Sequence, residues 1–373
     1  MSRLEYLLAA GLLRLVGLVC SFLPIDPERV ILASPRSPRL EGNLRHLHEA
    51  IRARHPGLRQ VVLVEPYGYS LRSKLAYLLR VMRGMVQLCR ARLFIIDNAY
   101  LPVHVRPHRK GTTVVQVWHA VSAVKRFGLD TTTPLREPER TFLHRYYDYV
   151  VVSSEDVRAA YAHALRTPRE RVLALGTPRT DLFFDPAAME AARERVLREQ
   201  PALQGRRVVV YAPTFRGRGR AKRAAPGLDA VRLRVALPPD HALVLKMHPN
   251  VESEGLSTAG YDVVIDRAAE LNELLCLTDV LITDYSAAIF EYALLRRPLV
   301  LLLPDLGDYE RDPGMLVDYR DEMIGTQVRD TDGVATAILS GDFDLSGYDA
   351  FIERHAGACD GAASERFVQT FLG

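Results

Sequence analysis

Polar residues suited to proton transfer and phosphate binding follow four short apolar runs of the sequence. The first is His119, which comes after the run Val114–Val117 and Trp118. A histidine titrates near neutral pH, so His119 is a candidate general base for an attacking hydroxyl, a role that contributes roughly 10²- to 10⁴-fold to a rate. A lone histidine can also be structural, but the position of His119 at the end of a predicted strand favours catalysis.

The second and third groups supply positive charge after two further apolar runs. Arg216 follows Val208–Tyr211, and an arginine at that place can hold phosphate oxygens in a bidentate fork. Lys246 and His248 are two residues apart at the end of the next run, so both side chains are expected to point the same way. Either would neutralise charge that builds on a phosphoryl group or its leaving group, and His248 is the second candidate catalytic residue.

The fourth group lies within DVLITDYSAAIFE, residues 279–291. A strand is expected to run into Asp284, and a helix is expected to begin near Ser286 and Ala287. A helix N-terminus offers backbone N–H groups and a partial positive charge, which favour phosphate. Glu291 lies further along that helix and is predicted to reach a ribose diol. The alternatives are a plain N-cap for Ser286 and a solvated helix position for Glu291.

Apolar runs that alternate with helical patterns would position these groups. Helical segments such as Leu40–Arg54 and Ala187–Glu199 separate the runs, which predicts βαβ units whose parallel strands carry ligands at their carboxyl ends. The pattern restarts at Val208, so the predicted fold is α/β, with two doubly wound Rossmann-like domains facing a central cleft, as in GT-B transferases. The predicted strands are Val30–Ala33, Val61–Val64, Leu93–Ile96, Val114–Val117, Tyr149–Val152, Val172–Ala174, Val208–Tyr211, Ala242–Lys246, Val263–Ile265, Val280–Thr283 and Leu299–Leu303.

The composition is that of an ordinary globular chain. Its 373 residues, 48% hydrophobic and 25% charged, predict two domains and exclude a disordered or fibrous protein. The four cysteines are widely spaced without a CxxC pair, which argues against a disulfide scaffold or zinc site and favours a reducing cytosol. No metal site is predicted, because the D-x-D triplets at 330–332 and 342–344 lie in polar stretches interpreted as surface loops.

Positive charge gathers in the first half of the chain. Residues 1–175 carry 27 Lys and Arg against 14 Asp and Glu, whereas the remainder carries 22 against 31. This asymmetry indicates that the first half faces an anionic partner, and a solvated surface of mixed charge is the alternative. No zinc-finger, KH, RRM or helix-turn-helix signature is present, so nucleic acid is not the expected partner.

Two segments of that half favour a membrane surface as the partner. Leu4–Leu23 is apolar but interrupted by Glu5 and Arg14, which suits a helix lying in the membrane interface better than one crossing it; a buried core helix is the alternative. Residues 70–92 form a basic amphipathic helix, typical of anionic surfaces. The predicted membrane-binding residues are Arg14, Arg72, Lys74, Arg80 and Arg83.

Six motifs occur in the order found in one enzyme family. They are VWHAVSAVKRFGLD, SSEDV, GTPRTD, YAPTFR, KMHP and LITDYSAAIFEYALLRRP. Over roughly residues 90–325 the chain resembles the CDP-glycerol glycerophosphotransferases of teichoic acid synthesis, which are peripheral membrane enzymes with a GT-B fold. Its length, its apolar N-terminal helix and the phrase QVWHA…KRFGL are most similar to the primase of the linkage unit.

The resemblance implies a reaction and a set of site residues. The implied enzyme transfers sn-glycerol 3-phosphate from CDP-glycerol to a sugar hydroxyl of an undecaprenyl-diphosphate-linked ManNAc-GlcNAc disaccharide and releases CMP, with no cofactor. His119 corresponds to the proposed catalytic histidine of the family. The other residues carried over by motif are Arg216, His248 and Ser286 at the pyrophosphate, and Asp284 and Glu291 in the nucleotide pocket.

Two positions depart from the family pattern. Ala120 stands where many relatives have glycine, and Ala287 replaces the second of two serines. Loss of one hydrogen-bond donor to the transition state lowers a rate roughly 10²-fold or more. Either backbone N–H groups stabilise more of the phosphate charge in this chain, or its donor substrate differs.

The resemblance also implies roles for three parts of the chain. Residues 1–23 would form the membrane-associated helix, 24–195 the acceptor and membrane-facing domain, and 196–373 the CDP-glycerol-binding domain, at the cytoplasmic face of the cell membrane. The oligomeric state is not predicted. The alternatives are a glycerol- or ribitol-phosphate polymerase, a GT-B nucleotide-sugar glycosyltransferase, and a non-catalytic membrane scaffold.

Overall fold

The computed structural model describes residues 3–64, 70–131, 142–216, 223–224, 227–247, 257–265 and 269–373. The chain forms two compact units: Met1–Asp181 together with Gly357–Gly373, and Leu182–Ala356. The division lies at 181/182 rather than at the predicted 195/196, because α7 (Pro186–Glu199) packs on α9 (Leu271–Leu277) of the second unit. The end of the chain belongs to the first unit and not, as predicted, to the second.

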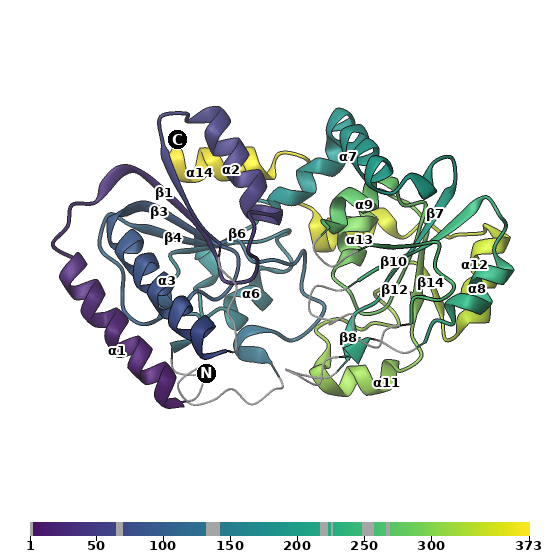
Figure 1. Cartoon of the computed structure of the whole chain (residues 1–373), viewed down its shortest axis with the longest axis horizontal. Helices are drawn as coiled ribbons and strands as arrows, with labels where there is room; N and C mark the ends of the chain where they lie inside the picture. The colour runs from purple at the N-terminus through teal and green to yellow at the C-terminus, as the bar shows by residue number, and fades with distance from the viewer. Residues whose placement is uncertain are drawn as a thin grey trace. The chain divides into compact units, whose positions relative to one another are not determined.

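The first unit is built on a parallel sheet of six strands in the order β2-β1-β3-β4-β5-β6. Figure 1 labels β1, β3, β4 and β6 of this sheet. In this sheet Ile31 stands opposite Val61 on one side and Phe94 on the other. Runs of Val, Ile and Leu form the strands because both faces of a parallel sheet are covered. The strands are β1 (Asp26–Ser34), β2 (Arg59–Val64), β3 (Ala91–Ile96), β4 (Thr113–Gln116), β5 (Tyr149–Val151) and β6 (Val172–Leu173).

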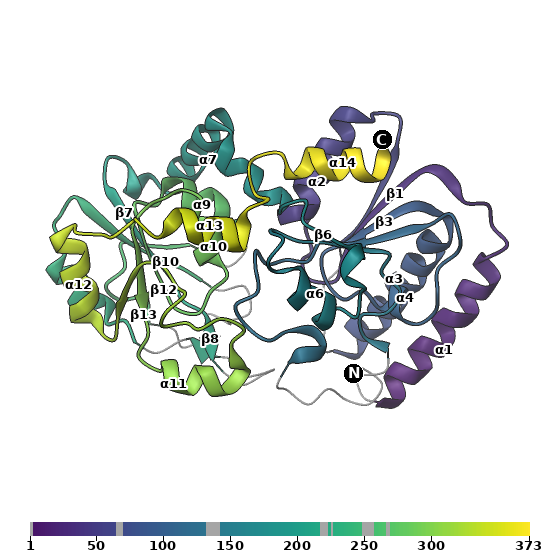
Figure 2. The same ribbon diagram turned by 180° about the vertical axis from the view of Figure 1, so that it is seen from behind.

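Alternate residues of these strands serve opposite faces of the sheet. Ile31 and Phe94 share a core with α1 (Arg3–Cys20) and α3 (Leu71–Arg90). Their neighbours Leu32 and Ile95 pack instead with α2 (Gly42–Arg54) and α14 (Ala363–Leu372). Figures 1 and 2 show α2 and α14 side by side, although most of the chain separates them in sequence. The shorter helices of this unit are α4 (Leu101–His104) and α6 (Arg158–Ala164).

The second unit repeats the plan with the order β11-β10-β7-β12-β13-β14. Its strands are β7 (Arg207–Ala212), β10 (His241–Lys246), β11 (Val263–Ile265), β12 (Val280–Thr283), β13 (Leu299–Leu302) and β14 (Thr326–Val328), with a separate antiparallel pair, β8 (Phe215–Arg216) and β9 (Arg223–Ala224). Its further helices are α8 (Ala230–Ala236), α10 (Ala288–Ala293), α11 (Leu306–Tyr309), α12 (Thr331–Ser340) and α13 (Tyr348–Ala356). Every strand predicted from an apolar run is present, which confirms the α/β prediction of two doubly wound sheets. Edge strand β14 was not predicted, because it is short and half polar.

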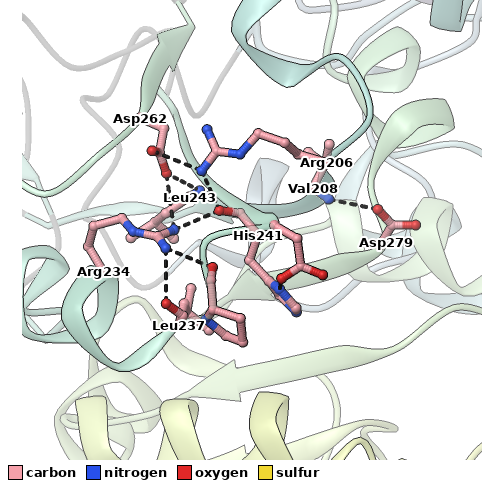
Figure 3. Close-up of polar contacts among 10 residues, drawn as sticks. Arg206, Val208, Arg234, Leu237, His241, Leu243, Asp262 and Asp279 are labelled. Carbon is pink, nitrogen blue, oxygen red and sulfur yellow. Dashed lines mark hydrogen bonds and ion pairs between the residues drawn. The ribbon is translucent and has the colours of Figure 1, made fainter.

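Carboxylates close the amino edge of the second sheet (Figure 3). Asp262, just before β11, accepts hydrogen bonds from the Leu243 N–H at 2.8 Å and from Arg234 at 3.2 Å. Asp279, just before β12, accepts from the Val208 N–H at 2.7 Å. These carboxylates accept hydrogen bonds from backbone N–H groups near the starts of β7 and β10. We therefore interpret this edge of the sheet as structural.

Helix α1 is buried on one face only. Ala10, Leu13 and Gly17 lie against the first unit, and a Cβ on Gly17 would lie 2.6 Å from the Arg106 guanidinium. The exposed large apolar residues of the N-terminal segment are Leu4, Leu7, Leu8, Leu15, Leu18, Val19, Phe22 and Leu23. The alternative of a buried core helix therefore holds for one face of α1, while the other face exposes apolar side chains. No helix in the described part of the chain has both the length and the apolar character needed to cross a bilayer.

Candidate active site

Polar side chains gather at the carboxyl edge of each sheet, where an α/β fold presents its ligands. In the first unit Ser34, Asp97 and His119 lie at or just beyond the ends of the neighbouring strands β1, β3 and β4. In the second unit the corresponding positions after β7, β10, β12 and β13 are Thr214, Lys246, Asp284 and Asp305.

A strained turn presents His119. Trp118 has a φ of +50°, a left-handed conformation that is rare for a bulky residue. Its N–H donates to Oε1 of buried Gln116 at 2.8 Å, and its carbonyl accepts from Nδ2 of Asn43, at the start of α2, at 2.9 Å. Side chains from β4 and α2 thus hold both the N–H and the carbonyl of Trp118, so tertiary contacts fix the turn. The turn displaces the following residue, His119, from the line of the strand.

The His119 ring is held in one tautomer. Nδ1 lies 3.4 Å from the backbone oxygen of Asp97, which can only accept, so Nδ1 carries the hydrogen and Nε2 keeps a lone pair. Burial, and then the charges of Arg36 and Arg179, hold the pKa of His119 well below its ordinary value. Arg179 also donates to the His119 carbonyl at 2.9 Å. The ring is therefore neutral at pH 7 with its free nitrogen available as a base.

A buried aromatic network supports this turn and was not predicted from the sequence. Gln116 donates from Nε2 to the Tyr147 hydroxyl at 3.3 Å, and His144 Nδ1 lies 3.0 Å from the same oxygen. Burial lowers the pKa of His104 to about 4 and that of His144 to about 3, so both rings are neutral and act as hydrogen-bonding groups. The network keeps Gln116 in place and, through it, the Trp118 N–H. Its members come from segments that share no motif, so the sequence did not predict the network.

Arg216 lies in a different setting from the one predicted. Its Nε and Nη2 donate to the two oxygens of Asp305 at 2.7 and 3.0 Å, and its Nη1 donates to Asp284 at 3.0 Å. The guanidinium also lies over the stacked rings of Tyr285 and Tyr309, 5.1 and 4.7 Å from their centroids. All three nitrogens thus bind protein groups, and the phosphate-binding role of Arg216 stays a prediction.

Asp284 joins two strand ends. One of its oxygens accepts from the Thr214 N–H at 2.8 Å and the other from the Thr214 hydroxyl at 2.7 Å. Its backbone oxygen accepts from the hydroxyl of buried Tyr319. Asp284 therefore links the ends of β7 and β12, and it is also a candidate site residue.

The remaining predicted donor-site residues surround this network to different degrees. Ser286 Oγ accepts from the Ala288 N–H at 3.2 Å, but the N-cap of the helix is Ala287 and not, as the alternative predicted, Ser286; this helix has only six residues. Glu291 is 2% exposed and Lys246 5%, so the solvated alternative for Glu291 is wrong. His248 lies outside the described residues. The ligand roles of these residues stay predictions.

The predicted membrane-binding cations differ in what they contact. Arg72 and Arg83 are exposed on α3, on the face that also exposes Leu75 and Leu79. Lys74 pairs with Glu5 at 2.8 Å. Arg14 donates from Nε to the Val105 carbonyl at 2.8 Å, and its guanidinium lies 5.0 Å from the ring centroid of Phe142, so it is directed at its own unit. Arg80 is partly buried.

The first D-x-D triplet marks a helix start instead of a surface loop. Asp330 caps α12 by accepting from the Gly333 N–H at 2.9 Å. Asp332 pairs with Arg232 at 2.6 Å. Both carboxylates thus have structural partners.

Comparison with known proteins identifies related chains. The teichoic acid ribitol-phosphate primase of Bacillus spizizenii strain W23 is 32% identical over 368 residues, which cover 95% of this chain and 94% of that protein. The teichoic acid poly(ribitol-phosphate) polymerase of the same strain is 33% identical over 360 residues, covering 95% of this chain but 58% of that protein. A structure of the wall teichoic acid polymerase TagF, a histidine variant soaked with CDPG, has a TM-score of 0.79 at 20% identity and covers 97% of this chain and 93% of that chain.

The fold and the sequence agree on one family. The likeness to TagF shows that this chain has the GT-B fold. Residues 16–373 match the family described as CDP-Glycerol:Poly(glycerophosphate) glycerophosphotransferase. The chain therefore belongs to this family of transferases.

Proposed function

We propose that this chain transfers a polyol phosphate from a CDP-alcohol to a sugar hydroxyl of a membrane-bound, lipid-linked disaccharide and releases CMP. The observation that carries the proposal is the neutral His119 ring, whose Nδ1 donates to a carbonyl and whose Nε2 is left as a base. Membership of the family supports the reaction class. Resemblance to the primase motifs supports a single addition.

In this reaction Nε2 of His119 takes the proton of the acceptor hydroxyl while the hydroxyl oxygen attacks the phosphorus that bears the polyol. The new O–P bond forms as the bond to the CMP oxygen breaks, and CMP leaves with the electron pair. Such an in-line displacement depends on positioning and on stabilisation of phosphate charge. We assign the reacting hydroxyl to the first unit and the donor to the second.

Residues of the second unit would hold the donor. We assign Lys246, His248 and the backbone around Ser286 and Ala287 to the phosphates, and Glu291 to the ribose. Arg216 would act on the donor through the two aspartates that it fixes, because its guanidinium already binds them. No metal or cofactor is part of the proposal.

Two donors are candidates. The motif resemblance favours CDP-glycerol, which delivers sn-glycerol 3-phosphate. The names of both relatives described above favour CDP-ribitol. Because the primase and the polymerase are 32% and 33% identical to this chain, identity does not distinguish one addition from many.

The deciding experiment measures CMP release from each CDP-alcohol in the presence of a synthetic lipid-linked disaccharide, followed by mass spectrometry of the lipid. One added polyol phosphate supports the primase, and a ladder of products supports a polymerase. Turnover only with nucleotide-sugars would support the GT-B glycosyltransferase. Lipid binding with no turnover of any donor would support the scaffold.

We further propose that the chain docks peripherally on an anionic membrane, at its cytoplasmic face, through the α1–α3 surface. We define this surface by the exposed leucines of α1 together with Leu75, Leu79, Arg72 and Arg83 of α3. Exposed apolar patches of this kind mark interaction sites, and each cation near an anionic leaflet adds about 1 kcal/mol. Docking there would bring the chain to a lipid-linked acceptor.

A further inference from the structure

Asp97 lies in the middle of the carboxyl edge of the first unit's sheet and is not among the predicted site residues. It directly follows β3, whose neighbours β1 and β4 end at Ser34 and just before His119. Its backbone oxygen is the atom that accepts from His119 Nδ1, at 3.4 Å. The residue therefore determines which ring nitrogen of His119 carries the hydrogen.

The Asp97 side chain is poorly satisfied for a partly buried carboxyl. It hydrogen-bonds Ser34, but among the described residues its Oδ1 is buried without a partner. Burial raises the pKa of Asp97 to about 6, against the hydrogen bond from Ser34 and the charge of Arg36, and Glu41 adds to the rise. An unpaired buried carboxylate oxygen destabilises a fold, so its presence at a site calls for a function.

The base needs a counter-charge. When His119 takes a proton it becomes a cation beside Arg36 and Arg179, both of which oppose that charge. Two acidic groups of the described residues lie near this edge: Asp97, whose carbonyl touches the ring, and Glu41, at the start of α2. Of the two, Asp97 has the described contact with His119.

We infer that Asp97 is a positioning residue for His119: its carbonyl fixes the ring tautomer, and its carboxylate offsets the positive charge that the ring acquires from the acceptor hydroxyl. This inference rests on the proposed function. The proton moves from the acceptor oxygen to Nε2 of His119 and later to solvent, and Asp97 itself exchanges no atom with the substrate.

The main test compares Asp97→Asn with wild type across pH. We expect kcat to fall roughly 10- to 100-fold, with KM for the CDP-alcohol unchanged, because only the transition state carries the imidazolium charge. The wild-type rate should rise with pH through about 6, and this rise should be absent in the variant. A kcat within twofold of wild type, or an unchanged pH profile, would overturn the inference.

A matched control lies at the other end of the same sheet. Asp26, at the start of β1, pairs with Arg29 and Arg59 at 3.3 Å each. Asp26→Asn removes a carboxylate of the same unit without touching the His119 edge, so its kcat and pH profile should match wild type.

A second variant covers the case in which Asp97→Asn fails to fold. Ser34→Ala removes the hydrogen bond to the Asp97 carboxyl and leaves every charged group in place. We expect the acid limb of the kcat profile to move to higher pH, since the carboxylate loses a donor. A limb that stays in place would overturn the inference.

A third measurement is independent of turnover. The NMR signals of the His119 ring should shift with a midpoint near pH 6 in wild type, as Asp97 ionises beside a ring that stays neutral, and this step should vanish in Asp97→Asn. Absence of the step in wild type would contradict the inference. If wild type turns over no CDP-alcohol, the proposed function fails while this titration still decides whether the two groups are coupled.

Discussion

At the carboxyl edge of the second sheet, opposite charges lie in direct contact: Arg216 is 2.7 Å from Asp305 and 3.0 Å from Asp284, and two tyrosine rings flank its guanidinium. At the same edge of the first sheet, a neutral histidine lies near two arginines, and a neighbouring carboxyl has one buried oxygen without a partner in the described part of the chain. We call the carboxyl edge of the second sheet the satisfied edge, because its charged groups are paired. We call that of the first sheet the unsatisfied edge, because of the Asp97 oxygen.

The difference follows what each edge is proposed to do. A donor diphosphate carries fixed charge, so its site benefits from a rigid, preorganised frame. Proton transfer requires a group whose charge changes during the reaction, and such groups are found where burial and neighbours shift the pKa. The first edge is therefore the place where substitutions should separate activity from stability, and the second edge is where they should not.

Removal of the base should give the largest effect. His119→Ala is expected to lower kcat by roughly 10²- to 10⁴-fold, because the acceptor hydroxyl loses its general base. Binding of the CDP-alcohol, measured by calorimetry, should stay near wild type, since the donor is assigned to the other unit. His48→Ala, on α2, is the control and should keep its activity. Lost donor binding by folded His119→Ala would move this histidine into the donor site.

Breaking the satisfied edge should mainly reduce stability. Arg216→Met leaves Asp284 and Asp305 without their cation, and loss of one partner of a buried pair costs about 3–5 kcal/mol in unfolding free energy. The Arg216 and Asp284 side chains are 12% and 4% exposed, so solvent screens them little.

Urea unfolding of the whole chain measures this loss of unfolding free energy. The control is Arg232→Met, whose partner Asp332 is equally near, but both side chains are more than 60% exposed. An exposed pair contributes at most about 1 kcal/mol, so this control should barely change stability. Equal losses in the two variants would show that the Arg216 network is not the frame of this edge.

The unsatisfied edge should respond in the opposite direction. Because the pKa of Asp97 is raised to about 6, the folded state prefers its proton, and stability is lost as pH rises from about 4 through 6. Asp97→Asn should therefore match wild type near pH 4 and be more stable at pH 7.5, by at most about 3 kcal/mol for a partly exposed group.

Thermal unfolding at the two pH values measures that gain. Asp26→Asn should show the reverse: burial alone would raise the pKa of Asp26, but a hydrogen bond from the Glu28 N–H and the charges of Arg59 and Arg29 lower it. Its carboxylate thus stabilises the fold above the ordinary pKa, and this stability is lost on acidification. If Asp97→Asn were less stable at pH 7.5, its carboxyl would be structural.

The smallest effect is expected away from both edges. Leu75→Ser with Leu79→Ser should weaken binding to anionic vesicles by about 1–3 kcal/mol and leave unfolding unchanged, because these leucines are 60% and 61% exposed. Val235→Ser, 83% exposed on α8, is the control for loss of surface apolar area. Vesicle sedimentation at two salt concentrations measures both. Equal weakening in the two variants would remove the α1–α3 surface from the proposal.

The sequence predicted the strands well because buried parallel strands need continuous apolar runs, and such runs are local. His119 was singled out for the same reason, since it follows one of them, and its catalytic role stays a prediction. The Trp118 φ of +50° was not predictable, because it depends on contacts from Asn43 and Gln116.

Partners distant in sequence explain the other differences. Asp305 is 89 residues from Arg216, and no motif joins them, so the pattern around Arg216 indicated an open phosphate fork. Asp97 was missed because a single aspartate after an apolar run has many structural explanations. Only its contact with the His119 ring separates it from them.

The position of α14 bears on how the chain folds during synthesis. Phe367 and Val368 of α14 complete the core that β1 and α2 begin near the N-terminus. The second unit is continuous, from Leu182 to Ala356, and contains all of its own sheet. On the ribosome the later unit can therefore finish first, while the earlier one waits with an uncovered hydrophobic face until its last helix emerges.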